Sequence, residues 1–133
     1  MAEKVCPVVI REEAGVTRLL AFDHPTAGKQ FVKGSIEDDE TALEAATREL
    51  EEESGIVAAG DVLDLGEAPI GSSVWHLFAL RVTDLPERWD HRTRDDFGHT
   101  FAFFWHPLSH DLGDDWHPQF HEALQMIRRS LQR

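Results

Sequence analysis

The sequence predicts an α/β/α sandwich with a mixed central sheet. Two segments show helical periodicity, at about 42–54 and about 117–132, and shorter segments rich in β-branched and aromatic residues lie before and between them. The length of 133 residues suits one domain with a sizeable core. We therefore expect residues 1–133 to form a single domain.

The first elements are expected to be strands. Residues 4–12 are predicted as one strand, with Pro7 marking an edge or a bulge, and residues 17–22 as a second, so that the two form a hairpin around Gly15. An edge strand could pair with a second copy of the chain, so both a monomer and a homodimer stay open. Short extended pieces are expected at 30–32, 56–59 and 62–67.

The first helix has signals at both ends. Thr41 is placed to cap its start, and Glu44 follows at the spacing of a capping box. Gly55 follows the last periodic position and favours a left-handed stop. We expect the helix to span residues 42–54.

Two later strands and the last helix complete the predicted sheet and its cover. Residues 73–82 and 100–106 carry apolar side chains on both faces, which is typical of central strands covered on both sides. The segment 84–99 between them reads as a long loop, and such loops are often functional. In the last helix Pro118 suits the first turn, and the apolar positions recur at helical spacing: Phe120, Leu124, Ile127 and Leu131.

The first helix gathers carboxylates on one side. At about 100° per residue, Glu49, Glu52 and Glu53 share a narrow fan beside an apolar stripe that includes Leu50. Like charges at this spacing repel, and oxygen ligands at this density suit a hard ion such as Mg²⁺ or Mn²⁺. The alternative interpretation is an acidic helix face exposed to solvent.

The spacing of residues 34–56 favours the metal-site interpretation. The segment resembles the Nudix box, G-x5-E-x7-R-E-U-x-E-E-x-G-U with U aliphatic, and every specified position is filled. The resemblance to the Nudix hydrolase family implies a Nudix fold. It also implies metal-dependent hydrolysis of a pyrophosphate bond in a nucleoside diphosphate linked to another moiety.

The resemblance also suggests roles within the box. Glu49, Glu52 and Glu53 match the family's metal-binding glutamates, and Arg48 matches the arginine that orients the first of them. The Gly34 carbonyl is a further candidate metal ligand. The general base varies among members and in some lies outside the box. The predicted catalytic residues are Glu52, Glu53 and Arg48, together with Asp96 from the long loop.

Substrate contacts are expected from four residues. Lys33 directly precedes the box, and the rings of Phe31, Trp75 and Trp89 could stack on a base. For each ring, packing in the core is the alternative. The short sequence markers that indicate a particular substrate in this family are mostly absent. Relatives that cleave diadenosine polyphosphates often carry a tyrosine beyond the box, and this chain has no tyrosine. Pro69 lies slightly before the position of a proline found in members that act on ADP-ribose.

The net charge and the cysteine content limit which binding partners and which cellular location we expect. A net charge of −12 argues against binding to nucleic acid or to an anionic membrane and favours a small nucleotide-type substrate. Cys6 is the only cysteine, so a reduced, cytoplasmic location is expected. A binding or sensor module that uses the fold without turnover is the alternative function.

Overall fold

The computed structural model describes residues 2–93 and 98–131. Its strands are β1 (Ala2–Glu13), β2 (Val16–His24), β3 (Gly28–Gln30), β4 (Gly34–Ser35), β5 (Val62–Ile70), β6 (Ser73–Arg81), β7 (Trp89–Arg92) and β8 (Thr100–Pro107), and its helices are α1 (Ala42–Ser54) and α2 (Pro118–Leu131).

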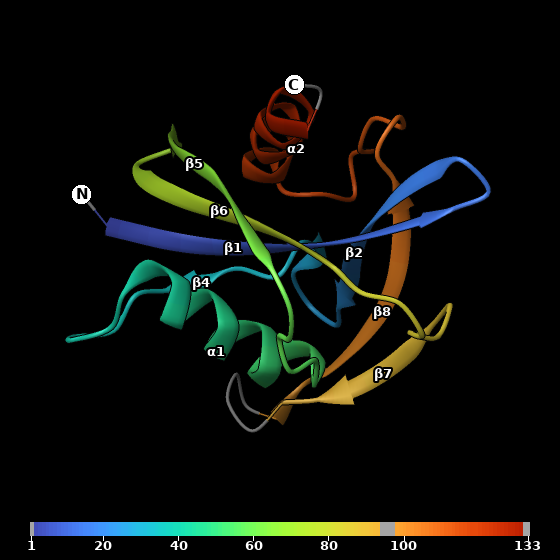
Figure 1. Ribbon diagram of the computed structural model, residues 1–133, viewed down its shortest axis with the longest axis horizontal. Helices are drawn as coiled ribbons and strands as arrows, with labels where there is room; N and C mark the ends of the chain where they lie inside the picture. The colour runs from blue at the N-terminus through green and yellow to red at the C-terminus, as the bar shows by residue number, and fades with distance from the viewer. Residues whose placement is uncertain (1, 94–97, 132–133) are drawn as a thin grey trace.

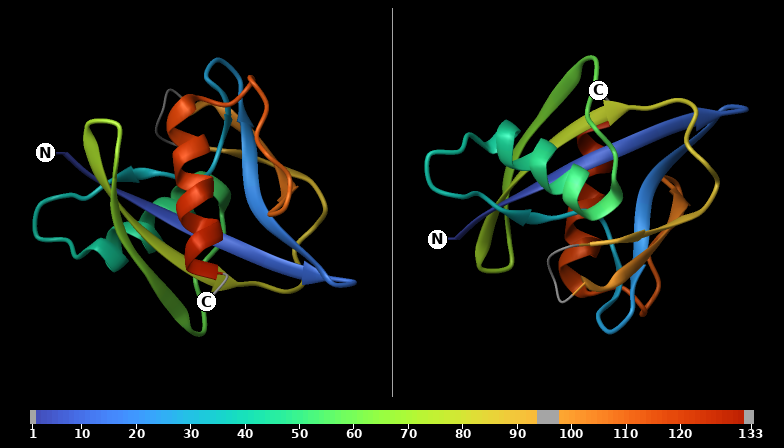
Figure 2. Two further views of the ribbon diagram at one scale, coloured as in Figure 1. Left: turned by 90° about the horizontal axis from the view of Figure 1, so that it is seen from above. Right: turned by 90° about the horizontal axis from the view of Figure 1, so that it is seen from below.

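A mixed sheet forms the middle layer of the molecule. The strand order is β5-β6-β1-β2-β8-β7, with β3 paired to β2 and β4 to β1. The pairing of β1 with β6 is parallel, and the other strand pairings are antiparallel. The two helices cover opposite faces of the sheet (Figures 1 and 2). The predicted α/β/α sandwich is therefore confirmed.

The prediction that residues 4–12 form an edge strand is wrong. Strand β1 lies in the middle of the sheet, between β6 on one side and β2 with β4 on the other. On that second side, Lys4 and Val5 of β1 pair with β4, and β1 pairs with β2 only from Ile10 onward. Pro7 lies between these two pairings, where a missing N–H donor costs least. Because β1 is flanked on both sides, it offers no free edge to a second copy of the chain.

Both helices form where the sequence predicts them. At the start of α1, the Glu44 amide donates to the Thr41 hydroxyl and the Thr41 amide donates to the Glu44 carboxylate, which completes the capping box. At its end, Gly55 adopts the left-handed conformation with a φ of 83°. Pro118 is the first residue of α2, and Arg128 and Arg129 lie in its last turn.

The core is divided by the sheet into two layers. Between the sheet and α2 lies the larger cluster, which contains Trp75, Leu77, Phe120 and Ile127. On the α1 side, Leu50 and Ile56 pack with residues of β1, β2 and β8, and Val5, Ala45, Ala46 and Phe78 form a smaller cluster. The apolar side of α1 is thus fixed against the sheet, and its acidic side is left for the surface.

The predicted long loop at 84–99 contains a strand. Residues Trp89–Arg92 form β7, which pairs antiparallel with β8. Its side chains alternate between half-buried and exposed, beginning with a half-buried Trp89. The alternation appears only in the structure, because the three residues after Trp89 are all polar and carry no period of two in the sequence.

The described part of the chain contains no helix that is long and apolar enough to cross a membrane.

Candidate functional site

The acidic side of α1 forms one wall of a surface cavity of about 300 Å³. Three of the predicted residues from α1 line it, together with Lys33 from the segment before the helix. The remaining described lining residues come from β2, β3, β8 and the residue directly after β7. Among the described residues, the lining consists of His24, Gln30, Lys33, Glu49, Glu52, Glu53, Thr93 and Phe101.

Arg48 binds several acidic side chains at once. Its guanidinium donates through Nε and Nη2 to both oxygens of Glu40, at 2.7 and 3.0 Å. Nη1 donates to Glu49 at 2.9 Å and to Glu52 at 3.2 Å, and Nη2 also reaches the Ser35 carbonyl oxygen at 3.0 Å. This planar, multidentate contact neutralises part of the acidic helix face from within the protein.

Glu40 joins the loop before α1 to the helix. Its carboxylate accepts from the Glu37 amide at 2.9 Å in addition to Arg48. The hydrogen bonds from Arg48 and from the Glu37 amide lower the pKa of Glu40 from 4.5 to about 2. The hydrogen bonds to Glu40, and after them the one to Glu49, raise the pKa of Arg48. This pair therefore stays ionised throughout the physiological range.

Gly34 lies directly against Glu49, the first of the three candidate metal-binding glutamates. A Cβ at residue 34 would overlap the carboxylate carbon of Glu49, so a glycine is needed for that carboxylate to lie beside the backbone. The side of Gly34 that faces the helix is therefore a cradle for a carboxylate. This close approach explains why a glycine starts the box.

Lys33 is a half-buried cation in the cavity wall. Its Nζ lies 5.6 Å from the ring centroid of Trp75 and 5.7 Å from that of Phe120. Burial lowers the pKa of Lys33, and the charge of Lys4 lowers it further. The ammonium group is thus held over two aromatic rings at the edge of an acidic cavity.

The predicted aromatic contacts lie elsewhere. Phe31 and Trp75 are 2% and 1% exposed and belong to the core beneath α2. Trp89 stacks on Phe103, with ring centroids 5.0 Å apart, and donates from Nε1 to the Ser54 carbonyl oxygen at 3.1 Å. None of these rings lines the cavity, and their packing agrees with the alternative of core positions. Asp96, the candidate catalytic residue from the long loop, lies outside the described residues.

Sequence reasoning missed four lining residues, which are His24, Gln30, Thr93 and Phe101. They lie on segments that come together only through strand pairing. Gln30 pairs with Phe22 in the β2–β3 hairpin, near His24. The His24 ring lies 5.1 Å from that of Phe101 across the pairing of β2 with β8. A local signal existed only for His24, which begins a turn by accepting from the Thr26 and Ala27 amides.

The candidate ligand atoms around the cavity are oxygens, which hard cations prefer. Glu49, Glu52 and Glu53 offer only oxygen, as Mg²⁺ and Mn²⁺ prefer, and the cradle at Gly34 holds the first carboxylate against the backbone. In the described residues, no three acidic, histidine or cysteine side chains converge as a ready-made metal cluster. The carboxylates of Glu49 and Glu52 are instead turned to Arg48, so binding an ion requires these two to reorient.

Comparisons with known proteins agree with this geometry. A NUDIX domain family model matches residues 4–124. The mitochondrial Nudix hydrolase 12 of Arabidopsis thaliana is 39% identical over 74 residues, and the match covers 47% of this chain and 36% of that protein. The chain thus spans only about a third of this curated relative.

Solved structures share the fold. The NUDIX domain of Shewanella oneidensis NrtR, complexed with ADP ribose, has a TM-score of 0.73 at 15% identity, covering 98% of this chain and 88% of that one. A binary complex of the C. elegans Ap4A hydrolase has a TM-score of 0.64 at 18% identity, covering 99% and 98%. At these identities the likeness concerns the fold alone. Because the family model spans most of the sequence, the chain belongs to the NUDIX domain family.

Proposed function

We propose that this chain is a metal-dependent hydrolase that cleaves a pyrophosphate bond in a nucleoside diphosphate linked to another moiety. The observation that carries the proposal is the cavity that Glu49, Glu52 and Glu53 line together with Lys33. Carboxylates next to a cation suit a ligand that carries both phosphate charge and a metal ion. Membership of the NUDIX domain family supports the same reaction class.

In this proposal Mg²⁺ or Mn²⁺ is held by Glu49, Glu52 and Glu53, with the Gly34 carbonyl as a further ligand. An ion of this kind neutralises phosphate charge and lowers the pKa of a bound water molecule. Arg48 orients the carboxylates of Glu49 and Glu52, since its guanidinium donates a hydrogen bond to each of them.

The remaining roles belong to side chains that face the substrate. Lys33 places a positive charge beside the phosphate oxygens. A water oxygen bonds to phosphorus as the bridging P–O bond breaks, and a carboxylate takes the water proton while the other phosphate leaves. We propose Glu53 as that carboxylate, with Glu52 beside it, and Asp96 stays a second candidate. Because Phe31, Trp75 and Trp89 are packed elsewhere, we propose that the half-buried His24 ring contacts the base.

Hydrolysis of a substrate panel tests the proposal. The panel holds nucleoside triphosphates, ADP-ribose, nucleotide sugars and dinucleoside polyphosphates, each with Mg²⁺, and phosphate or nucleoside monophosphate release is measured. We expect turnover of at least one member, and a loss of about 100-fold or more in Glu53→Gln because a positioned proton acceptor is removed. Glu51→Gln is the matched control, since Glu51 is exposed on the same helix and does not line the cavity. A wild-type protein as inert as Glu53→Gln across the panel contradicts the proposal.

A second candidate is a ligand-binding module without turnover. It is favoured by the likeness to the NUDIX domain of NrtR, which was crystallised with ADP ribose. Calorimetry with ADP-ribose separates the two functions. Tight binding that needs no Mg²⁺ and yields no product would support the module, and product formation would exclude it.

A further inference from the structure

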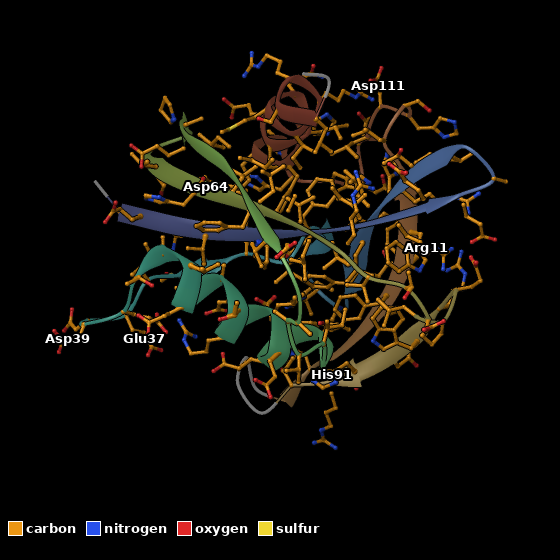
Figure 3. All side chains as sticks on the ribbon, in the orientation of Figure 1. Arg11, Glu37, Asp39, Asp64, His91 and Asp111 are labelled. Carbon is orange, nitrogen blue, oxygen red and sulfur yellow. The ribbon has the colours of Figure 1, made fainter. Side chains whose placement is uncertain are left out.

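We propose that Trp89 and His91 are positioning residues that fix the last turn of α1, and with it Glu52 and Glu53, relative to the opposite wall of the cavity. This inference rests on the proposed hydrolase function. It gives β7 a part in the site although neither side chain lines the cavity. Figure 3 shows His91 beside the carboxyl-terminal end of α1.

The last turn of a helix leaves carbonyl oxygens without partners inside the helix. Here β7 supplies two of the missing donors. Trp89 Nε1 donates to the Ser54 carbonyl oxygen at 3.1 Å, and His91 Nε2 lies 3.1 Å from the Glu52 carbonyl oxygen. Because a carbonyl oxygen only accepts, the histidine must carry its proton on Nε2 in this contact. The Gly55 amide donates to a third carbonyl oxygen, that of Glu51.

Packing holds both donors in place. The His91 ring lies against Gly55, where a Cβ would come within 3.1 Å of Nδ1. The Trp89 ring is nearly parallel to Phe103, with an interplanar angle of 10°. Such a stacked ring has little rotational freedom, so its N–H group keeps one direction. The contacts therefore restrain the helix end from two points of one strand.

The same strand is tied to the other wall of the cavity. His91 is the register partner of Phe101, and Phe101 lines the same cavity as Glu49, Glu52 and Glu53. The peptide carbonyl that His91 binds belongs to Glu52, whose side chain lines the cavity. Strand β7 thus sets the separation between the carboxylates on α1 and the wall formed by β8. Small errors in such positions reduce rates strongly.

Substitutions that remove one donor at a time test this role. Trp89→Phe deletes the N–H group and retains a stacking ring, and His91→Leu removes the ring donor. His91→Gln restores an amide donor of similar reach. The matched controls are an indole and an imidazole that contact backbone carbonyl oxygens outside α1. Trp105→Phe removes an indole bond to the Pro86 carbonyl oxygen, and His106→Leu removes a ring contact with the His110 carbonyl oxygen.

Three measurements are made on each variant. We expect hydrogen exchange at the amides of residues 52–56 to accelerate about tenfold in Trp89→Phe and His91→Leu. The Mg²⁺ affinity, measured by calorimetry, and kcat should each fall about 10- to 100-fold, while KM stays within about threefold because the substrate contacts remain. His91→Gln should recover most of the loss, and both controls should match the wild type.

The outcomes separate this inference from the proposed function. A wild type that neither binds Mg²⁺ nor turns over any substrate contradicts the proposed function. A wild type that does both, with Trp89→Phe and His91→Leu unchanged in exchange, Mg²⁺ affinity and kcat, overturns the positioning role. Equal losses in the two controls, or no recovery in His91→Gln, also overturn it, because the effect would then reflect general destabilisation.

Discussion

Arg48 acts as an internal counterion for a helix face that would otherwise repel itself. Its guanidinium contacts Glu40, Glu49 and Glu52, which come from the loop and from two successive turns of α1. The loop and the helix are therefore linked through one charged group. The family resemblance connects Arg48 to one glutamate, whereas the structure shows it hydrogen-bonded to three and 3.6 Å from the carboxylate of a fourth, Glu37.

The lowered pKa of Glu40 makes stability depend on pH. Its pKa is 4.5 when unperturbed and about 2 in the folded protein, so its contribution to stability is complete above about pH 5 and is lost as the pH falls toward 2. We expect Glu40→Gln to be less stable than the wild type at pH 7 and to approach it near pH 2.5. Urea unfolding at several pH values measures this, with the exposed Glu51→Gln as control. A constant difference between Glu40→Gln and wild type across this window would contradict the assignment.

Gly34 gives a second prediction at the scale of one residue. Gly34→Ala should displace the Glu49 carboxylate and weaken Mg²⁺ binding about tenfold or more, because the added Cβ would occupy the position of that group. Calorimetric titration with Mg²⁺ measures the effect. Gly113→Ala is the control, since the new Cβ there meets only the flexible end of Asp115. Equal Mg²⁺ affinities in the two variants would show that the cradle at Gly34 does not matter.

At the scale of elements, the end of α1 depends on one glycine for two reasons. Gly55 has a φ of 83°, and a side chain there would also press on His91. Gly60 has a φ of 81° but no neighbouring atom within 4 Å of an added Cβ. The two positions therefore share the backbone cost and differ in the contact.

Alanine substitutions at Gly55 and Gly60 separate the backbone cost from the cost of the contact with His91. Gly60→Ala should lower the free energy of unfolding by about 1–2 kcal/mol, the cost of a left-handed residue with a side chain. Gly55→Ala should lose at least about 0.5 kcal/mol more, through the lost His91 contact with the helix end. Chemical denaturation measures both values. If Gly55→Ala loses no more than Gly60→Ala, the His91 ring does not constrain this turn.

Elements with local signals were predictable, and those fixed by distant partners were not. The bounds of α1 follow from Thr41, Glu44 and Gly55, which act within one turn of either end. The central place of β1 does not follow from Pro7, because the tolerance for a proline depends on which strands lie beside it. Strand β7 was hidden because its pairing with β8, not its composition, makes it a strand.

In the candidate site, too, some residues could be predicted from local geometry and others depend on distant partners. Glu49, Glu52 and Glu53 could be grouped because helical geometry alone brings them together. His24 and Phe101 could not, because their approach depends on the pairing of β2 with β8. Phe31 and Trp75 look like binding residues in the sequence, and the packing of α2 onto the sheet buries them.

At the scale of the whole molecule, the sheet separates two apolar layers. Ile56 belongs to the layer on the α1 side and Ile127 to the layer beneath α2. Side chains in separate layers share no contacts, so their effects on stability should be independent.

A double-mutant cycle tests this independence. Ile56→Val and Ile127→Val should each cost about 0.5–1.5 kcal/mol, and the double variant should lose their sum within about 0.5 kcal/mol. Denaturant unfolding of the four proteins provides the values. A coupling energy well above that margin would mean that the layers relax together through the sheet.

The parallel pairing of β1 with β6 sets an order of assembly. Ala2 pairs with Ser73 and Ile10 with Arg81, so the first strand meets a partner from the other half of the chain. Closing so long a loop costs entropy before the contact forms, whereas the β1–β2 hairpin can form locally. Helix α1 packs on Val5 of β1 and Phe78 of β6. On a ribosome, α1 emerges after β1 and before β6, so the surface that holds the acidic helix is completed only after β6 has been synthesised.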